Sequence, residues 1–486
     1  MTLSEFDEWF PKRFHRTSSA LTTTTFILSD LLGIMASFGW GFFWVKIYGL
    51  VSLDERGLIN FKSFVTYWPY LPAFILIFQI MNLYPGISLA PAEELRRSFI
   101  GSFLAYGGVM LSRLIETQRW DAINSAFTIG AIFSTFILLT MRGIVHWLLH
   151  KTKLGGIPAV IYGSGSTGRL VIDRIQGSIR TGYVPVLILD DEAEGIGEYK
   201  GVPIIHDTGL GPEIVRLYNI KMAIVAMPKL DSRKLKILLN NSVSAFRYNV
   251  LIPDFFNVTN IWMSVRDFDG ILGFVTSHKL KMQWNLGMKR FADLAIVIVG
   301  GIILLPFLLF IALIIRISSP GPALYGHRRM GKDGKPFTAY KFRSMVLDSG
   351  ERLQKLLDSN PEMKKEWEEN HKLKNDPRIT KIGKFLRRLS IDEFPQLVNI
   401  LKGEMSLVGP RPITEAEVKK YGDDFNRIFS VSPGLTGMWQ VSGRSETDYA
   451  ARVSYDTYYL QSWSIWLDFW VLFKTFGAVA RGKGAY

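Results

Sequence analysis

The 486-residue sequence contains no cysteine, which excludes a disulfide framework and a cysteine-ligated zinc or iron site. Its seven histidines form no HExxH-like pair, so a histidine-based zinc site is not expected either. The sequence also lacks internal repeats, low-complexity stretches, and a signal-peptide cleavage pattern after the opening residues MTLSEFDEWFPKRFHR. We therefore expect a chain of roughly two to four domains that keeps its N-terminus.

Acidic residues are outnumbered, with 43 Asp and Glu against 57 Lys and Arg, for a net charge of +14. Such an excess favours anionic partners, which include nucleic acid, phosphorylated small molecules and anionic lipid headgroups. The hydrophobic fraction of 48% is ordinary, but apolar residues are concentrated in the first 150 positions and in 291–315. This distribution indicates an integral membrane protein, and we expect no nucleic-acid partner.

Four apolar segments precede residue 150, and each is close to the ~20 residues that a helix needs to cross the hydrocarbon core. They are residues 20–45, 66–84, 98–115 and 122–149. Lys12 and Arg13 precede the first segment, and Arg142 and Lys151 lie at or beyond the end of the fourth. The positive-inside rule therefore places the N-terminus and everything after residue 150 in the cytoplasm. Because Arg113 lies near the end of the third segment, three spans plus a surface helix is the alternative.

Residues 157–276 have the pattern of a soluble α/β domain, with short β-branched runs that alternate with polar, helix-like stretches. The first predicted strand leads into Gly163, Gly165 and Gly168, which form a G-x-G-x-x-G motif at the start of a helix. Asp190 and Asp191 end the second strand, as in the dinucleotide-binding fingerprint. No Tyr-x-x-x-Lys pair follows. A bound nucleotide and a purely structural or dimerising domain both remain open.

The apolar run 291–315 is long enough to span a membrane, but basic residues lie on both sides of it. Lys289 and Arg290 come directly before it, so the charge rule gives no side preference. We expect a helix that enters the membrane and returns, broken at Gly300-Gly301 and Pro306. A proline-kinked full crossing, with residues 317–486 outside, is the alternative.

The region 317–486 carries the densest polar motifs. Asp392 and Glu393 stand at the start of a short predicted helix that ends at Gly403, with Pro395 in its first turn. Ser390-x-x-Glu393 also matches a capping box, which would make the acid purely structural. However, the basic run before the pair and the Gly-Pro-Arg-Pro turn after it are typical of a phosphoryl-transfer site. A carboxylate there can act as nucleophile or hold Mg²⁺ on a diphosphate.

Several motifs resemble the polyprenyl-phosphate hexose-1-phosphate transferases, the monotopic bacterial phosphoglycosyl transferases. They are YKFRSM (340–345), LKNDPRIT (373–380), SIDEFPQLVNILKGEMSLVGPRP (390–412), PGLTGMWQVSGR (433–444) and the closing GAY. The whole layout is similar to the undecaprenyl-phosphate galactose phosphotransferase branch. The resemblance implies transfer of a hexose-1-phosphate, with galactose-1-phosphate favoured, from a UDP-sugar to undecaprenyl phosphate, with release of UMP. It also implies Mg²⁺, the bacterial inner membrane, a catalytic domain on the cytoplasmic face, and the first membrane step of surface-polysaccharide synthesis.

The same resemblance implies roles for individual residues. Asp392 matches the nucleophile that forms a phosphosugar intermediate. Glu393 matches its partner, which assists with Mg²⁺ and with deprotonation of the lipid phosphate. The expected substrate- and phosphate-binding residues are Arg378, Arg387, Arg388, Arg411, Gln440 and Arg444. Lys289 and Arg290 match a basic pair at the membrane interface, and Pro306 matches the helix break, although Leu305 replaces the serine that many members place before it.

The predicted architecture joins a four-span helical bundle, a Rossmann-like α/β domain and an α-rich catalytic domain with a re-entrant helix. Its parts are a cytoplasmic segment 1–19, the bundle 20–150, the Rossmann-like domain 155–276, the transferase domain 279–486 and the re-entrant helix 289–316. We expect a homodimer. The alternative functions are a glucose-1-phosphate transferase of the same family, a nucleotide-sensing membrane scaffold, and a membrane-bound NAD-dependent sugar-nucleotide enzyme.

Overall fold

The structure, a computed structural model, describes most of the chain in two compact units, 1–257 and 258–486, which are treated separately. The described residues are 19–48, 67–86, 89–152, 156–177, 182–192, 197–252, 263–268, 271–276, 279–360, 363, 376–442 and 449–480. The first unit holds the N-terminal apolar helices and the α/β domain, and the second holds the acid pair.

All four predicted apolar segments of the first unit contain a helix. The helices are α2 (Ser19–Tyr48), α4 (Leu71–Ile80), α5 (Pro91–Thr117) and α6 (Ala122–Thr152), and η2 (Trp68–Tyr70) precedes α4. Helices α2, α5 and α6 are long and apolar enough to cross a membrane. Helix α4 has only 10 residues, about half of what a crossing needs, so the expected helix over 66–84 is wrong in its length.

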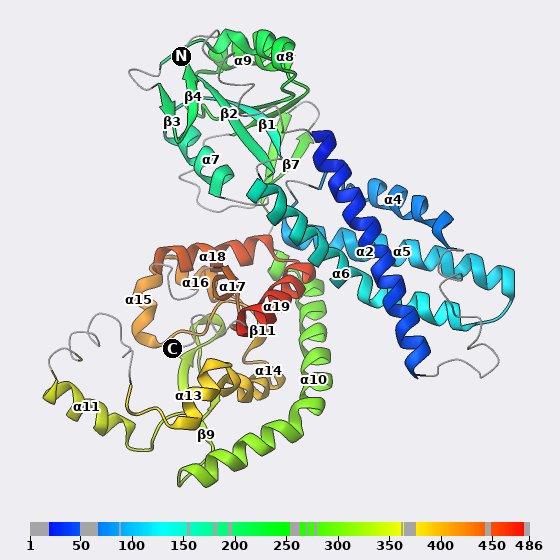
Figure 1. Ribbon diagram of the computed structural model, residues 1–486. Coiled ribbons are helices and arrows are strands. Elements are labelled where there is room, and N and C mark those ends of the chain that lie inside the picture. The colour runs from blue at the N-terminus through cyan, green and yellow to red at the C-terminus, as the bar shows by residue number, and fades with distance from the viewer. Residues whose placement is uncertain are drawn as a thin grey trace. The chain divides into compact units, whose positions relative to one another are not determined.

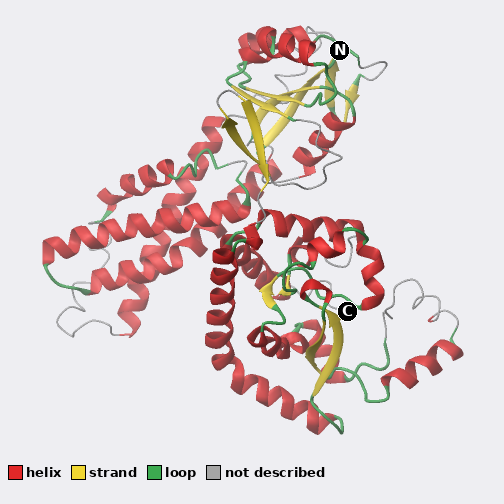
Figure 2. Ribbon diagram, turned by 180° about the vertical axis from the view of Figure 1, so that it is seen from behind, coloured by secondary structure: helices red, strands yellow, loops and turns green. Residues whose placement is uncertain are grey.

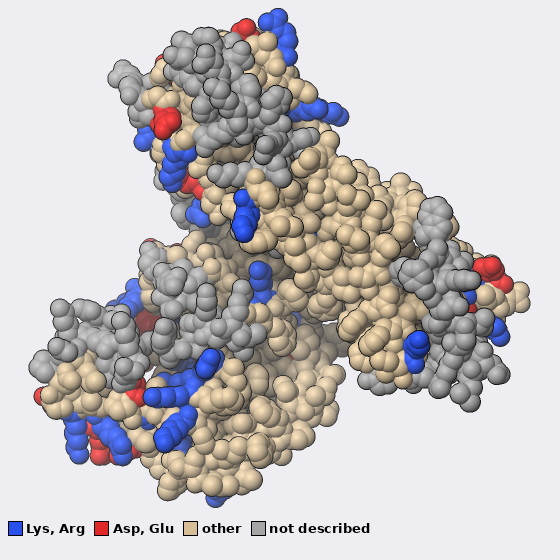
Figure 3. Space-filling view, viewed as in Figure 1, with Lys and Arg blue, Asp and Glu red and all other residues tan. Residues whose placement is uncertain are grey.

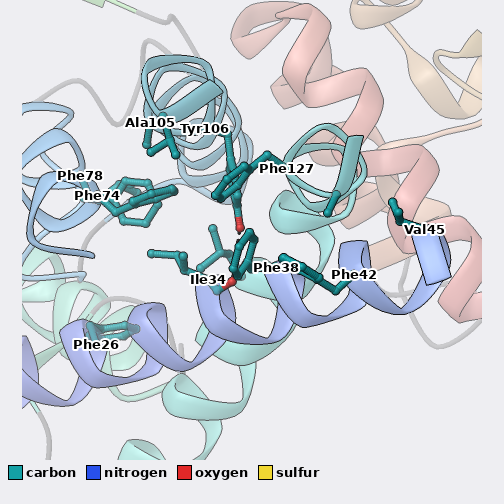
Figure 4. Close-up of a cluster of buried hydrophobic side chains, with 14 of the residues drawn as sticks. Phe26, Ile34, Phe38, Phe42, Val45, Phe74, Phe78, Ala105, Tyr106 and Phe127 are labelled. Carbon is teal, nitrogen blue, oxygen red and sulfur yellow. Dashed lines mark hydrogen bonds between the residues drawn. The ribbon is translucent and has the colours of Figure 1, made fainter. Parts of the chain in front are cut away.

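Helices α2 and α6 pack along each other. Buried side chains of α2, α4, α5 and α6 together form the core of this part (Figure 4). A Cβ on Gly41 would lie 2.1 Å from the carbonyl oxygen of Ala126, so the glycine permits the close approach. Arg142 is not a flanking basic residue, because it is buried and bonds Asp30 at 2.9 Å and Glu94 at 3.1 Å. This ion cluster ties α2, α5 and α6 together. In Figure 3 the surface over α2 is nearly without charge.

The α/β domain has a six-stranded sheet in the order β3-β4-β2-β1-β5-β6. The strands are β1 (Ile157–Tyr162), β2 (Tyr183–Leu189), β3 (Glu198–Tyr199), β4 (Val202–Ile205), β5 (Met222–Val225) and β6 (Tyr248–Leu251). All except β3 run parallel, which confirms the predicted parallel sheet, and their order is that of a Rossmann fold.

Helices cover both faces of this sheet (Figures 1 and 2). They are α7 (Ser166–Gly177), α8 (Gly211–Tyr218) and α9 (Ser232–Asn241), with the short turns η3 (Thr208–Leu210) and η4 (Val243–Ala245). Ile172 of α7 packs with Ile161 on one face, whereas Ile214 of α8 and Leu238 of α9 pack with Val160 on the other. The alternation along β1 therefore feeds two separate cores.

In its described residues, the second unit is rich in helices and has three small two-stranded sheets. The sheets pair β7 (Met263–Phe268) with β8 (Ile271–Thr276), β9 (Leu324–Met330) with β10 (Pro336–Phe342), and β11 (Ser406–Val408) with β12 (Gly434–Thr436). The α-helices are α10 (Gln283–Ser318), α11 (Ser349–Ser359), α13 (Lys381–Arg388), α14 (Leu397–Lys402), α15 (Val418–Tyr421), α16 (Asp424–Ile428), α17 (Met438–Ser442), α18 (Tyr449–Ser462) and α19 (Ile465–Ala480). The 3₁₀ turns are η5 (Lys279–Lys281), η6 (Lys332–Gly334), η7 (Ile391–Gln396) and η8 (Glu415–Glu417).

Helix α10 is continuous over 36 residues, so the expected break at Gly300-Gly301 and Pro306 does not interrupt the helix. The helix instead bends between its ends (Figures 1 and 2). Near its start, the Asp293 carboxylate accepts a hydrogen bond from Ser406 Oγ at 2.7 Å. Near its end, Ile311 and Ile315 pack in a cluster with Leu386. Both halves of the helix therefore contact the same folded unit, while most apolar side chains between these contacts are exposed.

Candidate active site

The acid pair lies in the 3₁₀ turn η7, directly before α14. Ser390 precedes it with φ 55°, a left-handed conformation that is uncommon for a residue other than glycine. The Ser390 side chain makes no capping hydrogen bond, so the capping-box interpretation of Ser390 and Glu393 is wrong. Gly403 ends α14 with φ 86°, which confirms the predicted helix end.

Glu393 is held by cations. Lys341 Nζ lies 2.7 Å from its Oε1, and Arg411 Nη2 lies 3.6 Å from the same oxygen. Burial alone would raise the pKa of Glu393, but the positive charges of Lys341, Arg411 and Arg329 outweigh it and lower the pKa to about 2. Glu393 is therefore ionised at any physiological pH.

Asp392 has the opposite environment. The residue is only 9% exposed. Burial raises its pKa, and the neighbouring negative charge of Glu393 raises it further, against the opposing effect of Lys341 and Arg387. Two adjacent carboxyl groups with pKa values pushed apart are typical of acids with separate roles in one reaction.

A small open pocket borders Glu393, and three cationic side chains line it. They come from three places in the chain: Arg329 from β9, Lys341 from β10 and Arg411 from the turn after β11. Gln396, from the same turn as the acids, completes the polar part of the wall. The pocket thus presents positive charge to a ligand beside one ionised carboxylate.

The other predicted phosphate-binding residues are placed differently. Arg378 is buried and bonds Asp376 through two nitrogens, at 2.8 and 2.6 Å. Arg387 Nε donates to Ser344 Oγ at 2.9 Å, and its charge also acts on Asp392. Arg388 is exposed at the end of α13, and Gln440 is partly buried on α17. Arg444 lies outside the described residues.

Lys289 and Arg290, the predicted membrane-interface pair, bond to other residues of the second unit. Lys289 is buried, with its Nζ 2.7 Å from Asp468 Oδ2 of α19. Arg290 donates to the carbonyl oxygens of Ile400 and Leu401, which are the C-terminal carbonyls of α14. A cation at a helix C-terminus is stabilising, so Arg290 holds the helix that carries the acid pair at its other end. Pro306 is exposed within α10.

The glycine loop of the first unit has the backbone of a nucleotide-binding turn. Gly163 has φ 105°, a Cβ on Gly168 would lie 1.9 Å from the Gly163 carbonyl oxygen, and a Cβ on Gly165 would meet nothing within 4 Å. The two acids of the dinucleotide-binding fingerprint already accept hydrogen bonds from the protein. Asp190 accepts two hydrogen bonds from Ser164 at 2.6 Å, and Asp191 accepts two from Thr208 at 2.8 and 2.6 Å.

Sequence reasoning missed three residues that the structure brings to the site or to its support. Lys341 and Arg329 lie on adjacent strands, and only the fold brings them to Glu393. Asp293 accepts hydrogen bonds from Ser406 Oγ at 2.7 Å and from the Leu407 N–H at 3.2 Å. The sequence did carry a signal for Asp293, because it is an acid within the apolar run 291–315 and ionisable residues in such segments usually have a function.

Comparison with known proteins gives two family matches and several relatives. A model described as bacterial sugar transferase matches residues 284–482, and one described as CoA-binding domain matches residues 88–244. The chain is 35% identical to the undecaprenyl-phosphate galactose phosphotransferase of Salmonella typhimurium, over 77% of this chain and 78% of the relative. It is 35% identical to a UDP-galactose-lipid carrier transferase of Erwinia amylovora, over 76% of this chain and 78% of the relative. Identity is 29% to the UDP-glucose:undecaprenyl-phosphate glucose-1-phosphate transferase of Escherichia coli, over 80% of each chain.

Proposed function

Because the chain belongs to the family of polyprenyl-phosphate hexose-1-phosphate transferases, we propose that it transfers a hexose-1-phosphate from a UDP-sugar to undecaprenyl phosphate. The reaction releases UMP and is the first membrane step of surface-polysaccharide synthesis. Galactose-1-phosphate is the favoured group, since two of the relatives above are named for galactose. Glucose-1-phosphate is the second candidate, since another relative is named for glucose.

The observation that carries this proposal is the pair of adjacent carboxyls with opposite pKa shifts beside a cationic pocket. In the proposed first step, an Asp392 carboxylate oxygen attacks the β-phosphorus. The bond from that phosphorus to the bridging oxygen breaks, and UMP leaves with the electron pair. In the second step, an oxygen of undecaprenyl phosphate attacks the same phosphorus, and the Asp392 carboxylate is released.

Glu393 has a different role in this proposal. A carboxylate with a pKa of about 2 is a weak base. The low pKa of Glu393 therefore favours an electrostatic role over deprotonation of the lipid phosphate. Its contact with Lys341 at 2.7 Å also fixes the lysine at the pocket wall. We propose that Glu393 keeps Lys341 and Arg411 oriented toward the diphosphate.

Mg²⁺ fits the residues present. Among the described residues, no group of three or more His, Asp or Glu could hold a metal by itself. Mg²⁺ does not need one, because it binds through one or two carboxylates plus substrate phosphates. Asp392 and Glu393 would be those carboxylates, and the bound ion would neutralise charge on the diphosphate.

The arrangement of α10 supports a helix that enters the inner membrane and returns to the cytoplasmic face. Asp293 in its first half and Ile315 in its second half both contact the domain that carries the acids. Side chains between them, such as Ile303 at 73% exposure, are left for lipid. The acid pair would then face the cytoplasm.

We also propose a homodimer with the Rossmann-like domain as its contact. Strand β6 has only one neighbouring strand among those described, and Tyr248, Val250 and Leu251 on it are exposed. An exposed apolar edge strand is a surface that proteins usually cover.

The test is UMP release from a panel of UDP-sugars by detergent-purified protein with Mg²⁺ and undecaprenyl phosphate. The proposal expects release from one or a few UDP-hexoses, with UDP-galactose first among them. If no UDP-sugar yields UMP in the presence of lipid and metal, the proposed reaction is wrong.

A further inference from the structure

The described arginines of the second unit that are not exposed fall into two groups. In the first group, protein acceptors occupy the guanidinium. Arg343 donates to the carbonyl oxygens of Ser319 and Pro320. Arg378 donates to the carboxylate of Asp376, and Arg387 donates to the hydroxyl of Ser344.

In the second group, Arg329, Arg411 and Arg452 donate no side-chain hydrogen bond to any residue that the structure describes. A half-buried guanidinium without an acceptor is costly unless a ligand provides one.

Glu417 does not supply the missing acceptor. Arg329 Nη1 lies 3.5 Å from its Oε2 and Arg452 Nη1 lies 3.6 Å from its Oε1, whereas charge-assisted hydrogen bonds are about 2.7–2.9 Å long. The same carboxylate accepts the Thr414 N–H at 2.8 Å and the Thr414 hydroxyl at 2.9 Å. Glu417 therefore lies beside both Arg329 and Arg452 but accepts no hydrogen bond from either guanidinium group.

Aromatic rings contact two of these arginines, Arg411 and Arg452. The Arg452 Cζ lies 4.9 Å from the centre of the Trp439 ring, 5.2 Å from Tyr449 and 5.7 Å from Tyr421. Arg411 lies 5.8 Å from the centre of the same Trp439 ring. The Nε of Arg452 is buried without a hydrogen-bond partner among the described residues. The ring contacts thus restrain the guanidinium groups of Arg411 and Arg452 before any ligand arrives, which lowers the entropic cost of binding.

Like charges gather at this position. Burial lowers the pKa of Arg329, and the positive charge of Arg411 lowers it further. Arg329 and Arg411 both line the pocket beside Glu393, and Arg452 is joined to them through Glu417 and Trp439. Two arginines that line the pocket and a third beside them indicate a site for a multiply charged anion.

We infer that Arg329 and Arg452 complete, with Arg411, a subsite that binds the diphosphate of the nucleotide sugar. This inference rests on the proposed function, and it assigns to Arg329 and Arg452 the role that sequence reasoning gave to Arg378. A diphosphate fits three guanidinium forks better than one lipid phosphate does, because it offers two phosphate groups and a bridging oxygen. Glu417 is a positioning residue, because its negative charge lies beside both Arg329 and Arg452 and offsets their mutual repulsion.

The experiment measures UDP binding by isothermal titration to detergent-purified Asp392→Asn protein, in which turnover does not interfere. Arg329→Gln and Arg452→Gln are compared with Arg352→Gln, which removes an exposed arginine that bonds Asp348 on α11. Each of the first two changes should weaken UDP binding about ten- to a hundredfold, since each removes charge-assisted hydrogen bonds, and Arg352→Gln should leave it unchanged. Arg329→Lys and Arg452→Lys should bind with intermediate affinity, and melting temperatures confirm that each variant is folded.

In the otherwise wild-type enzyme, the same variants should raise KM for the UDP-sugar without raising KM for undecaprenyl phosphate. The inference would be overturned if Arg329→Gln and Arg452→Gln bound UDP as tightly as Arg352→Gln does. It would also be overturned if only the KM for undecaprenyl phosphate rose, because the arginines would then bind the lipid phosphate. If a glutamine variant does not fold, unchanged UDP affinity in its lysine variant would overturn it as well. A parent protein that binds no UDP at all would instead overturn the proposed function, and this inference with it.

Discussion

At the residue scale, the site depends on how two neighbouring carboxyls are made chemically different. Asp392 and Glu393 follow each other in one turn, yet burial dominates at Asp392 and the cations dominate at Glu393. Lys341 contacts Glu393 directly at 2.7 Å and acts on Asp392 only through its field. The pair can therefore present one permanent anion and one carboxyl that titrates.

This difference predicts the pH dependence of turnover. Asp392 must be ionised to attack phosphorus, and its pKa is raised, so activity should be full above that pKa and fall as the pH drops through it. Glu393→Gln removes a charge that raises this pKa, so the acid limb of the residual activity should move to lower pH. Lys341→Met removes a charge that lowers it, and the limb should move to higher pH. The measurement is kcat/KM for the UDP-sugar against pH, and an acid limb at the same pH in all three proteins would contradict the assignment.

The sequence was sufficient to find the acid pair and the end of its helix at Gly403, because both lie within one short motif. It was not sufficient for Ser390, whose left-handed backbone comes from its tertiary setting. Nor could it find Arg329, which reaches Glu393 only because β9 pairs with β10. Arg378 looked available in the sequence, and only the structure reveals the bonds to Asp376.

At the scale of the element, α10 supports the site as well as providing an apolar segment. Lys289 contacts α19, Arg290 caps α14, and Asp293 holds β11, whose continuation carries Arg411. Three successive contacts of one helix thus position the parts of the chain that surround the acid pair. A periodic apolar pattern predicts such a helix but does not reveal which polar residues it buries.

Asp293 provides the test of this support. Asp293→Ala should leave the Leu407 N–H without an acceptor and Ser406 Oγ with only the Val408 carbonyl oxygen, at a cost of about 1–3 kcal/mol for the unpaired buried group. The melting temperature in detergent should fall, and activity should fall with it because β11 positions Arg411. Asp293→Asn is the matched control, since it keeps one acceptor oxygen and should lose less stability. Equal melting temperatures for wild type and Asp293→Ala would refute the supporting role.

At the scale of the whole molecule, the apolar segments and the α/β domain could be predicted because periodicity and glycine spacing are local signals. The length of α4 could not, since the segment 66–84 is apolar throughout but forms a helix only over Leu71–Ile80. The side of the membrane on which the second unit lies depends on α10, which is long enough at about 54 Å to cross if it were straight.

The cysteine-free sequence allows this topology to be tested with single cysteines. Ser454→Cys places a thiol at an exposed position of α18, and Arg119→Cys places one at an exposed position between α5 and α6. The predicted four-span topology counts segment 66–84 as a crossing, although its helix covers only Leu71–Ile80. In that topology, a membrane-impermeant maleimide added to intact cells should label Arg119→Cys and leave Ser454→Cys unlabelled until the membrane is permeabilised. An unlabelled Arg119→Cys would show that segment 66–84 does not cross. Labelling of Ser454→Cys in intact cells would show that α10 crosses the membrane completely.

The most direct measurement is the pre-steady-state release of UMP from the UDP-sugar in the absence of undecaprenyl phosphate. A covalent Asp392 intermediate predicts a burst of UMP that is stoichiometric with enzyme and then stops until lipid is added. Asp392→Asn should fold, since the change is nearly isosteric, but should give no burst. The account would be contradicted if Asp392→Asn gave the same burst of UMP as the wild-type enzyme. It would also be contradicted if the wild-type enzyme released no UMP until lipid was added.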